Sequence, residues 1–455
     1  MRLIARYAKD LGESFELITV YDGKRETEQI SKTHLTAHTL TTKYPSAIWF
    51  ERKIHDDFGI RFVGSFDTRP LVHQERFPAD TYPMRKDFQT PEITPAPFKP
   101  YAYEVVQGDG VFQVSVGPIH AGIIEPGHFH FSQAGEGILH QEVRHFYTYR
   151  GIEKMLEGKS LSEAKPLIER ISGNASIAYQ IALRDIRCAS TQTKLPRSLQ
   201  KYHALLLEIE RVIHHWTDLG FIPNDAGFAA ALAYGSRVAE EARRMLKTLT
   251  GHRFGFGAVG LDGGRVPAEE LEAWLDTLEE EIGYFENWIT GIPSLWDRFD
   301  TTGILSHEAA KKYGVVGVVA RASGVMNDSR ETVFYLEHGF RPVIQKRGDV
   351  AARFKVRIAE VKNAVAMMRH FLEPEIASVV AGEPVDGSYS TLVESAIGEL
   401  YMEIDIAQGR IARFFVRDPS FVNWQALHLM MPGNIIADFP LINKSCDLSY
   451  AGNDL

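Results

Sequence analysis

The sequence predicts an α+β fold in three parts: a small N-terminal α/β domain over residues 1–88, a linker over 89–100, and a mainly helical bundle with flanking β-rich segments over 101–455. Three observations support this division. Short β-rich runs surround one helical segment before residue 88, four prolines fall within residues 91–100, and apolar residues recur at helical spacing after Gly137. A chain of 455 residues is long enough to bury more than one core.

The N-terminal elements and the linker follow from composition. The β-rich runs and the single helix before residue 88 are typical of a small α+β unit. A proline-rich segment can continue neither a helix nor a central strand, so residues 89–100 are predicted to be extended. Beyond them, residues 103–138 alternate apolar and polar side chains around glycines, which predicts strands and turns.

Helices are predicted over the centre of the chain. Apolar residues from Leu205 to Leu219 recur at helical spacing, with Gly220 placed at the end of that helix. Further helices are expected at residues 229–250, after Pro267, and at 352–372, whereas residues 315–320 fit a buried strand or helix.

Composition excludes several classes of function. The net charge is −9, from 59 acidic and 50 basic side chains, which disfavours binding to nucleic acid or to anionic lipid. Only two cysteines occur, Cys188 and Cys446, so we expect a reducing compartment and no iron–sulfur cluster held by this chain alone. No segment approaches the roughly 20 apolar residues that cross a bilayer, so no direct membrane span is expected.

The first family signature lies in the N-terminal domain. The run Glu51-Arg-Lys-Ile-His-Asp-Asp-Phe-Gly-Ile60 is followed by Gly64, Asp67, Arg69 and residues 82–88. This pattern resembles the end of the 30-kilodalton-type subunit of respiratory complex I. The resemblance implies that the segment braces a large subunit against a neighbour that carries an iron–sulfur cluster.

A second resemblance covers nearly everything after the linker. It is similar to nickel-iron hydrogenase large subunits and to the 49-kilodalton-type subunit of complex I, and the fused order is most similar to the large subunit of formate-hydrogenlyase-type complexes. The motifs in chain order are Ser115–His120 with Glu125–His128, Tyr149–Lys154, Leu207–His215 with Leu219–Gly220, Thr302–Leu305 with Gly314 and Ala320–Val325, Val393–Glu399, and Arg417–Asn423.

The metal ligands of the hydrogenase branch are missing. Hydrogenases hold nickel and iron with two Cys-x-x-Cys pairs, because soft thiolates suit that centre. The four corresponding positions are Ser172, Ala175, Ser449 and Gly452, and Cys446 lies three residues out of register. The resemblance therefore implies no nickel-iron site and no hydrogenase activity.

The complex I branch, which also lacks the metal, implies a quinone cavity instead. Its quinone-binding histidine matches His128, whereas its tyrosine and aspartate positions fall at Gly173 and Ser172, so Tyr179 is a candidate substitute for the phenol. Glu125 matches a proton-handling carboxylate of the hydrogenases. We therefore predict His128, Glu125 and Tyr179 as catalytic residues.

Four further residues are predicted to line the cofactor or acceptor site: His120, Ser172, Asp447 and Arg321, with Arg321 expected to face the cluster-bearing partner. His128 and His130 with His120 and Glu125 form an alternative candidate, a metal site. It lacks further ligands, so no metal is predicted. Glu208, Glu210 and Arg211 are expected to form internal salt bridges.

The resemblance implies an oxidoreductase subunit of the NADH:quinone oxidoreductase or hydrogenase type. It would dock a small iron–sulfur subunit and integral membrane subunits that translocate ions, at the cytoplasmic face of the membrane, and pass electrons to a quinone or another small acceptor in a cavity between His128, Ser172 and Tyr179. The alternative is a coupling or scaffold subunit without catalysis. A free-standing enzyme is disfavoured because no nucleotide-binding glycine fingerprint follows a strand. The electron donor, the acceptor and the ion stay open.

Overall fold

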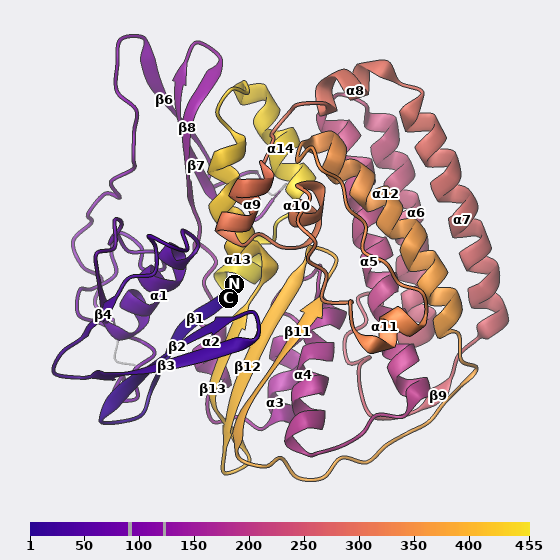
Figure 1. Cartoon of the computed structure of the whole chain (residues 1–455), viewed down its shortest axis with the longest axis horizontal. Coiled ribbons are helices and arrows are strands. Elements are labelled where there is room, and N and C mark those ends of the chain that lie inside the picture. The colour runs from indigo at the N-terminus through magenta and orange to yellow at the C-terminus, as the bar shows by residue number, and fades with distance from the viewer. Residues whose placement is uncertain (90–92, 122–123) are drawn as a thin grey trace.

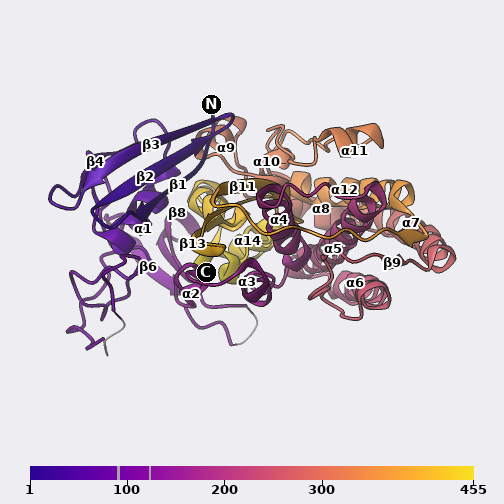
Figure 2. The ribbon, with the colours of Figure 1, turned by 90° about the horizontal axis from the view of Figure 1, so that it is seen from below.

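Figure 1 shows the computed structural model of the chain, which describes residues 1–89, 93–121 and 124–455. Residues 90–92 of the predicted linker lie outside the described residues. Small sheets gather on one side of the molecule and long helices on the other, with one sheet between them (Figures 1 and 2). The predicted α+β fold class is confirmed.

The N-terminal part is an antiparallel sheet of order β1-β2-β3 with helix α1 packed against β1, beside a small parallel pair, β4 and β5. Gly59 ends α1 in the left-handed conformation, at φ 78°, and its N–H bonds to the His55 carbonyl. The bounds are β1 Leu3–Asp10, β2 Ser14–Tyr21, β3 Lys24–Ser31, β4 Thr36–His38, α1 Ala47–Phe58 and β5 Arg61–Val63.

This N-terminal part packs directly on the rest of the chain. The Tyr7 ring stacks on the Phe415 ring, with centroids 4.1 Å apart. Lys53 of α1, itself buried, reaches Glu153 at 3.0 Å. A buried ammonium needs a partner carboxylate, so this ion pair fixes the position of α1 on the larger part.

Two antiparallel sheets flank the helices, with orders β6-β7-β8 and β11-β12-β13. The first forms an arm that projects from the body in Figure 1, and it carries the strands predicted within residues 103–138. The bounds are β6 Val111–Val116, β7 His128–Ala134, β8 Gly137–Arg144, β11 Gly387–Glu394, β12 Glu399–Ala407 and β13 Arg410–Arg417, with a short pair β9 Gly264–Arg265 and β10 Glu375–Ile376.

The bundle consists of four long helices that run side by side in both views (Figures 1 and 2): α5 Arg197–Asp225, α6 Ala229–Thr250, α7 Ala268–Thr290 and α12 Val350–Phe371. Burial follows the predicted periodicity. On α7 the buried side chains are Leu271, Leu275, Leu278, Ile282, Phe285 and Ile289. None of the helices in the described residues is long and apolar enough to cross a membrane.

Gly220 does not end its helix, contrary to the sequence prediction. It lies inside α5, where a Cβ atom would come within 3.0 Å of the Ala231 carbonyl and 3.3 Å of the Gly235 Cα on α6. The close approach of the two helices therefore favours glycine here, and the side-chain pattern alone does not distinguish that role from a terminator.

Short helices complete the chain, and α4 packs on β11 and β12. Residues 315–320, predicted as buried strand or helix, enter the buried helix α10. The bounds are α2 Ile152–Leu156, α3 Leu161–Ile168, α4 Ser176–Ser190, α8 Pro293–Phe299, α9 His307–Tyr313, α10 Gly317–Ala322, α11 Val333–Glu337, α13 Pro419–Asn423, α14 Phe439–Cys446 and α15 Tyr450–Asp454, with 3₁₀ helices η1 Trp424–Met430 and η2 Ile436–Asp438.

Candidate functional site

Two loops far apart in the chain meet at Ser172, ahead of α4, and Ser449, the N-cap of α15. Their hydroxyl oxygens lie 2.9 Å apart and both side chains are buried. Ser172 donates to Asn174, so Ser449 is the donor to Ser172, and the Ser449 oxygen also accepts from the Gly452 N–H at 2.9 Å. The two segments expected to converge are thus joined by hydroxyl groups.

Tyr179 of α4 lies in the same buried cluster. Its hydroxyl donates to Asp418 Oδ2 at 2.8 Å, and Asp418 Oδ1 accepts from the Ser420 N–H at 2.8 Å at the start of α13. Burial and the adjacent Asp418 raise the pKa of Tyr179 well above its ordinary value. Burial also raises the pKa of Asp418, although hydrogen bonds from Ser420 and Tyr179 act in the opposite direction. We name Ser172, Tyr179, Asp418 and Ser449 the hydroxyl cluster.

Arg150 and Asp418 take part in this region although the sequence patterns assigned them no role. The Arg150 guanidinium donates to the Ile171 carbonyl at 2.8 Å and to the Ala451 carbonyl at 2.7 Å, so it ties both loops together. Arg150 and Asp418 both stand inside family motifs, at 149–154 and 417–423. Motif membership was the available signal, but it does not say which side chain points to the cluster.

Glu210 supports the cluster from α5 and forms no salt bridge within the described residues, in contrast to the sequence prediction. Its carboxylate accepts from the N–H groups of Ile177 and Ala178, at 2.7 and 3.2 Å, and so caps the first turn of α4. Burial raises the pKa of Glu210 to about 7. The cap comes from another helix, so no local capping motif could reveal it.

The donor set does not fit a nickel-iron centre. The four positions that the resemblance assigns to thiolates carry two hydroxyls, a methyl group and a glycine, at Ser172, Ser449, Ala175 and Gly452. Across the described residues, no group of three or more His, Cys, Asp and Glu side chains is arranged to hold a metal ion. Cys446 is buried and its sulfur contacts Met430 at 3.8 Å.

Glu125 contacts the C-terminal segment, whereas His120 bonds to the backbone near Glu125. Glu125 is exposed and its carboxylate accepts from the Ala451 N–H at 2.8 Å. His120 Nε2 lies 2.7 Å from the Gly127 carbonyl, to which it donates. Glu125 is therefore brought to the edge of the hydroxyl cluster, while His120 bonds to the Gly127 backbone.

Among the described residues, no hydrogen bond joins His128 to Ser172 or Tyr179, so the cavity between these three residues stays a prediction. On β7, Phe129 packs toward Trp424 and Phe439, so His128 points to the opposite face of the sheet. There its Nδ1 lies 2.6 Å from the Tyr103 hydroxyl. Burial lowers the pKa of His128 to about 4, and nearby His130 and Arg144 act in the same direction.

Asp447 lies at the C-terminal end of α14, ahead of Ser449 in the chain. It caps α14 in a left-handed conformation and accepts from Lys444 at 3.2 Å. Burial alone would raise the pKa of Asp447, but Lys444 and Arg357 outweigh it and lower the value to about 2. Asp447 is thus the ionised partner of Lys444, whose side chain is 26% exposed.

Arg321 is completely buried and does not face outward, contrary to the expectation of a partner-facing side chain. It donates to Glu360 Oε1 and Glu394 Oε1, each at 2.7 Å, and burial, which would lower its pKa, is outweighed by these carboxylates. We name the surrounding group the ionic network, and it comprises Glu208, Arg211, His215, Arg321, Asp328, Arg330, Glu360 and Glu394.

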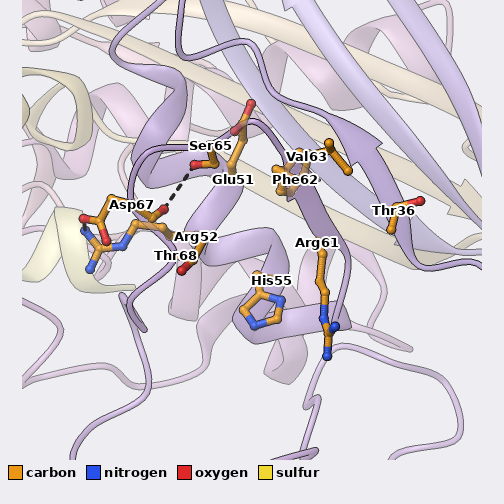
Figure 3. Close-up of a pocket in the computed structure, with 10 residues that line it drawn as sticks. All are labelled: Thr36, Glu51, Arg52, His55, Arg61, Phe62, Val63, Ser65, Asp67 and Thr68. Carbon is orange, nitrogen blue, oxygen red and sulfur yellow. Dashed lines mark hydrogen bonds and ion pairs between the residues drawn. The ribbon is translucent and has the colours of Figure 1, made fainter.

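The N-terminal signature lines a cavity of about 440 Å³ between α1, β5 and the following loop (Figure 3). The acidic residues of the signature that line the cavity bond to groups of the chain itself. Glu51 accepts from the Thr39 hydroxyl at 2.6 Å and the Leu40 N–H at 2.7 Å, and Arg52 bonds to Asp67 at 2.9 Å. These hydrogen bonds hold the neighbouring loops in position around the cavity.

Comparison with known proteins decides the family. One family model, described as respiratory-chain NADH dehydrogenase, 49 Kd subunit, matches residues 225–377 and 377–454, about half of the chain. The chain belongs to this family. A second model, respiratory-chain NADH dehydrogenase, 30 Kd subunit, matches residues 9–94, so both resemblances drawn from the motifs are confirmed.

Relatives of this 49-kDa-family chain cover most of its length. Formate hydrogenlyase subunit 5 of Escherichia coli (strain K12) is 29% identical over 442 residues, covering 91% of this chain and 76% of that protein. Hydrogenase-4 component G of the same organism is 28% identical, covering 91% and 75%. An NADH-quinone oxidoreductase subunit of Phocaeicola vulgatus is 26% identical, covering 78% and 74%.

A solved structure shares the fold. A chain of the membrane-bound sulfane sulfur reductase, described as an archaeal respiratory membrane complex, superposes with a TM-score of 0.69 at 21% identity, covering 76% of this chain and 99% of that chain. At this identity the likeness concerns the fold alone.

Proposed function

We propose that the chain is the soluble-arm large subunit of a membrane-bound redox complex related to complex I and to energy-converting hydrogenases, and that it has no hydrogenase activity. One observation carries the proposal: Ser172 and Ser449 meet at 2.9 Å where the related hydrogenases converge their thiolates. Hydroxyl groups are poor ligands for a centre that requires soft thiolates.

The proposal includes partners. A chain with only Cys188 and Cys446 needs electrons from a small iron–sulfur subunit, and integral membrane subunits would hold both at the cytoplasmic face of the membrane. The relatives support this, because they are named as parts of a formate hydrogenlyase, a hydrogenase and an NADH-quinone oxidoreductase.

The electron acceptor would be a quinone or another small molecule that takes up protons on reduction. Tyr179 is the protonated group of the hydroxyl cluster, and Glu125 lies at its edge, where the side chain reaches solvent. A positioned acid contributes about 10²- to 10⁴-fold to a proton-transfer step. His128, paired with Tyr103, offers a second donor on the other face of β7.

The test is purification of the intact complex, followed by metal analysis and acceptor screening. We expect no nickel and no hydrogen-dependent dye reduction; stoichiometric nickel would refute the proposal. With an accepted electron acceptor, Tyr179→Phe should lower turnover about 10²-fold while assembly is retained. If His128→Ala has that effect and Tyr179→Phe does not, the acceptor site lies at the Tyr103–His128 pair.

A second candidate, a coupling subunit without catalysis, is favoured by one observation. Ser172, Tyr179 and Asp418 are each at most 1% exposed and bond to groups of the chain itself. If Tyr179→Phe, His128→Ala and Glu125→Gln all assemble and keep wild-type turnover, this second function is the correct one.

A further inference from the structure

Asp418 and Gly452 are in unusually close contact inside the hydroxyl cluster. A Cβ atom placed on Gly452 would lie 2.6 Å from the Asp418 carboxyl carbon and closer still to Oδ2. Such separations are well inside van der Waals contact, and no flexible chain end is available to yield, because the carboxyl group is two bonds from its own backbone. Only glycine fits at position 452 while Asp418 keeps this position.

Two hydrogen bonds hold the buried Asp418 carboxylate in place. It caps α13 by accepting from the Ser420 N–H and accepts from the Tyr179 hydroxyl at 2.8 Å, and the residue is 1% exposed. The Ser420 hydroxyl in turn accepts from the Ser449 N–H at 2.8 Å. Moving Asp418 aside would therefore break a helix cap and leave a buried phenol without its partner.

We infer that the Asp418 carboxyl group occupies the space that a metal-binding side chain at position 452 would need, so that this site excludes a metal even when all four thiolates are restored. The inference rests on the proposed function, in which this space holds no metal. It goes further by placing the block at a residue outside the four ligand positions.

Volume and charge make different predictions here. A carboxylate would attract a cation, so its charge alone favours metal binding, whereas its volume opposes the side chain at 452. Asp418→Asn keeps the volume and removes the charge. Asp418→Ser keeps an N-cap oxygen for α13 and vacates the contact with Gly452.

The experiment uses the full chain with Ser172→Cys, Ala175→Cys, Ser449→Cys and Gly452→Cys combined, in three versions that carry Asp418, Asp418→Asn or Asp418→Ser. Each is titrated with Co²⁺ alone under anaerobic, reducing conditions, and thiolate ligation is followed by its near-ultraviolet and visible absorption. Circular dichroism and gel filtration verify the fold of each version. We expect the Asp418→Ser version to bind Co²⁺ at least tenfold more tightly than the other two.

Equal binding by the Asp418 and Asp418→Ser versions would overturn the inference, and so would thiolate binding by none of the folded versions. Tight binding by Asp418→Asn would show that charge and not volume is the block, which also overturns it. If the four-cysteine chain does not fold, Gly452→Ala with and without Asp418→Ser tests the same contact by melting temperature. Nickel in the wild-type chain is a separate result that bears on the proposed function.

Discussion

The hydroxyl cluster and the ionic network are both buried in this chain, but they are stabilised by different interactions. The cluster contains hydroxyls and one carboxylate beside a glycine, and short contacts fill its space. The ionic network contains four carboxylates, Glu208, Asp328, Glu360 and Glu394, against three guanidiniums, Arg211, Arg321 and Arg330. The cluster therefore depends on volume, whereas the network depends on charge balance.

This difference separates the effects of substitution. Deleting one partner in the network leaves a buried charge unpaired, which costs far more than an unpaired hydroxyl. Burial and the neighbouring Asp328 already raise the pKa of Glu394 to about 7, although Arg321 and Arg330 act in the opposite direction. Removing a guanidinium widens the excess of carboxylates, so the network is the more sensitive of the two regions.

The largest effect is expected for Arg321→Met. The change keeps the apolar stem but removes the partner of Glu360 and Glu394, so it should destabilise the chain by about 3–5 kcal/mol. Thermal melting of the purified chain measures it. Arg410→Met is the matched control, since Arg410 is 60% exposed and should change stability by less than about 0.5 kcal/mol. Equal melting temperatures for the two variants would contradict the dependence on charge.

Gly452→Ala should have the next largest effect, about 1–3 kcal/mol, because the added methyl group collides with Asp418. Asp418→Ser in the same chain should recover part of this loss, which a double-mutant cycle measures. Gly173→Ala is the control, since a Cβ atom there meets no other atom within 4 Å. An additive cycle would show that the two residues do not compete for space.

The third prediction concerns pH and Glu210, whose pKa burial raises to about 7. The unfolded chain releases this proton near pH 4, so between about pH 4 and 7 the folded state binds more protons than the unfolded state. The contribution of Glu210 to stability should therefore be greatest below about pH 4 and fall by up to about 1.4 kcal/mol per pH unit toward pH 7. Glu210→Gln should remove this contribution. Parallel stability profiles for both chains from about pH 4 to 7 would refute it.

The smallest effect is expected for Glu125→Gln. The amide oxygen can still accept from the Ala451 N–H, and the side chain is exposed. The free energy of unfolding, measured by thermal melting, should therefore change by less than about 0.5 kcal/mol. Any larger fall in turnover of the assembled complex then reports on proton delivery and not on folding. A marked loss of stability would show that the carboxylate charge itself holds the C-terminal segment.

Much of the fold could be predicted, because helical periodicity is local. The α7 stripe and the end of α6 at Gly251 follow directly from neighbouring residues. The meeting of Ser172 and Ser449 was expected only through the family resemblance. No local pattern reports on Asp418, whose partner Tyr179 is 239 positions away.

The orientation of His128 on β7 could not be predicted from the strand pattern. Alternation correctly places His128 and His130 on one face, but both faces of this strand are covered. Phe129 meets Phe439 on one side, and the Tyr103 ring stacks on His130 on the other. Since both faces of β7 carry buried side chains, polarity could not tell which face the histidines would take.

Lys53 joins the N-terminal part rigidly to the rest of the chain. Its buried ammonium is shared between Asp57 of α1 and Glu153 of α2, and Glu153 also accepts from Arg413 of β13 at 3.1 Å. Swinging α1 away would expose and unpair several charges at once. A displacement of the N-terminal sheet by a neighbouring protein would therefore be transmitted through α1 into α2 and β13 by these ion pairs.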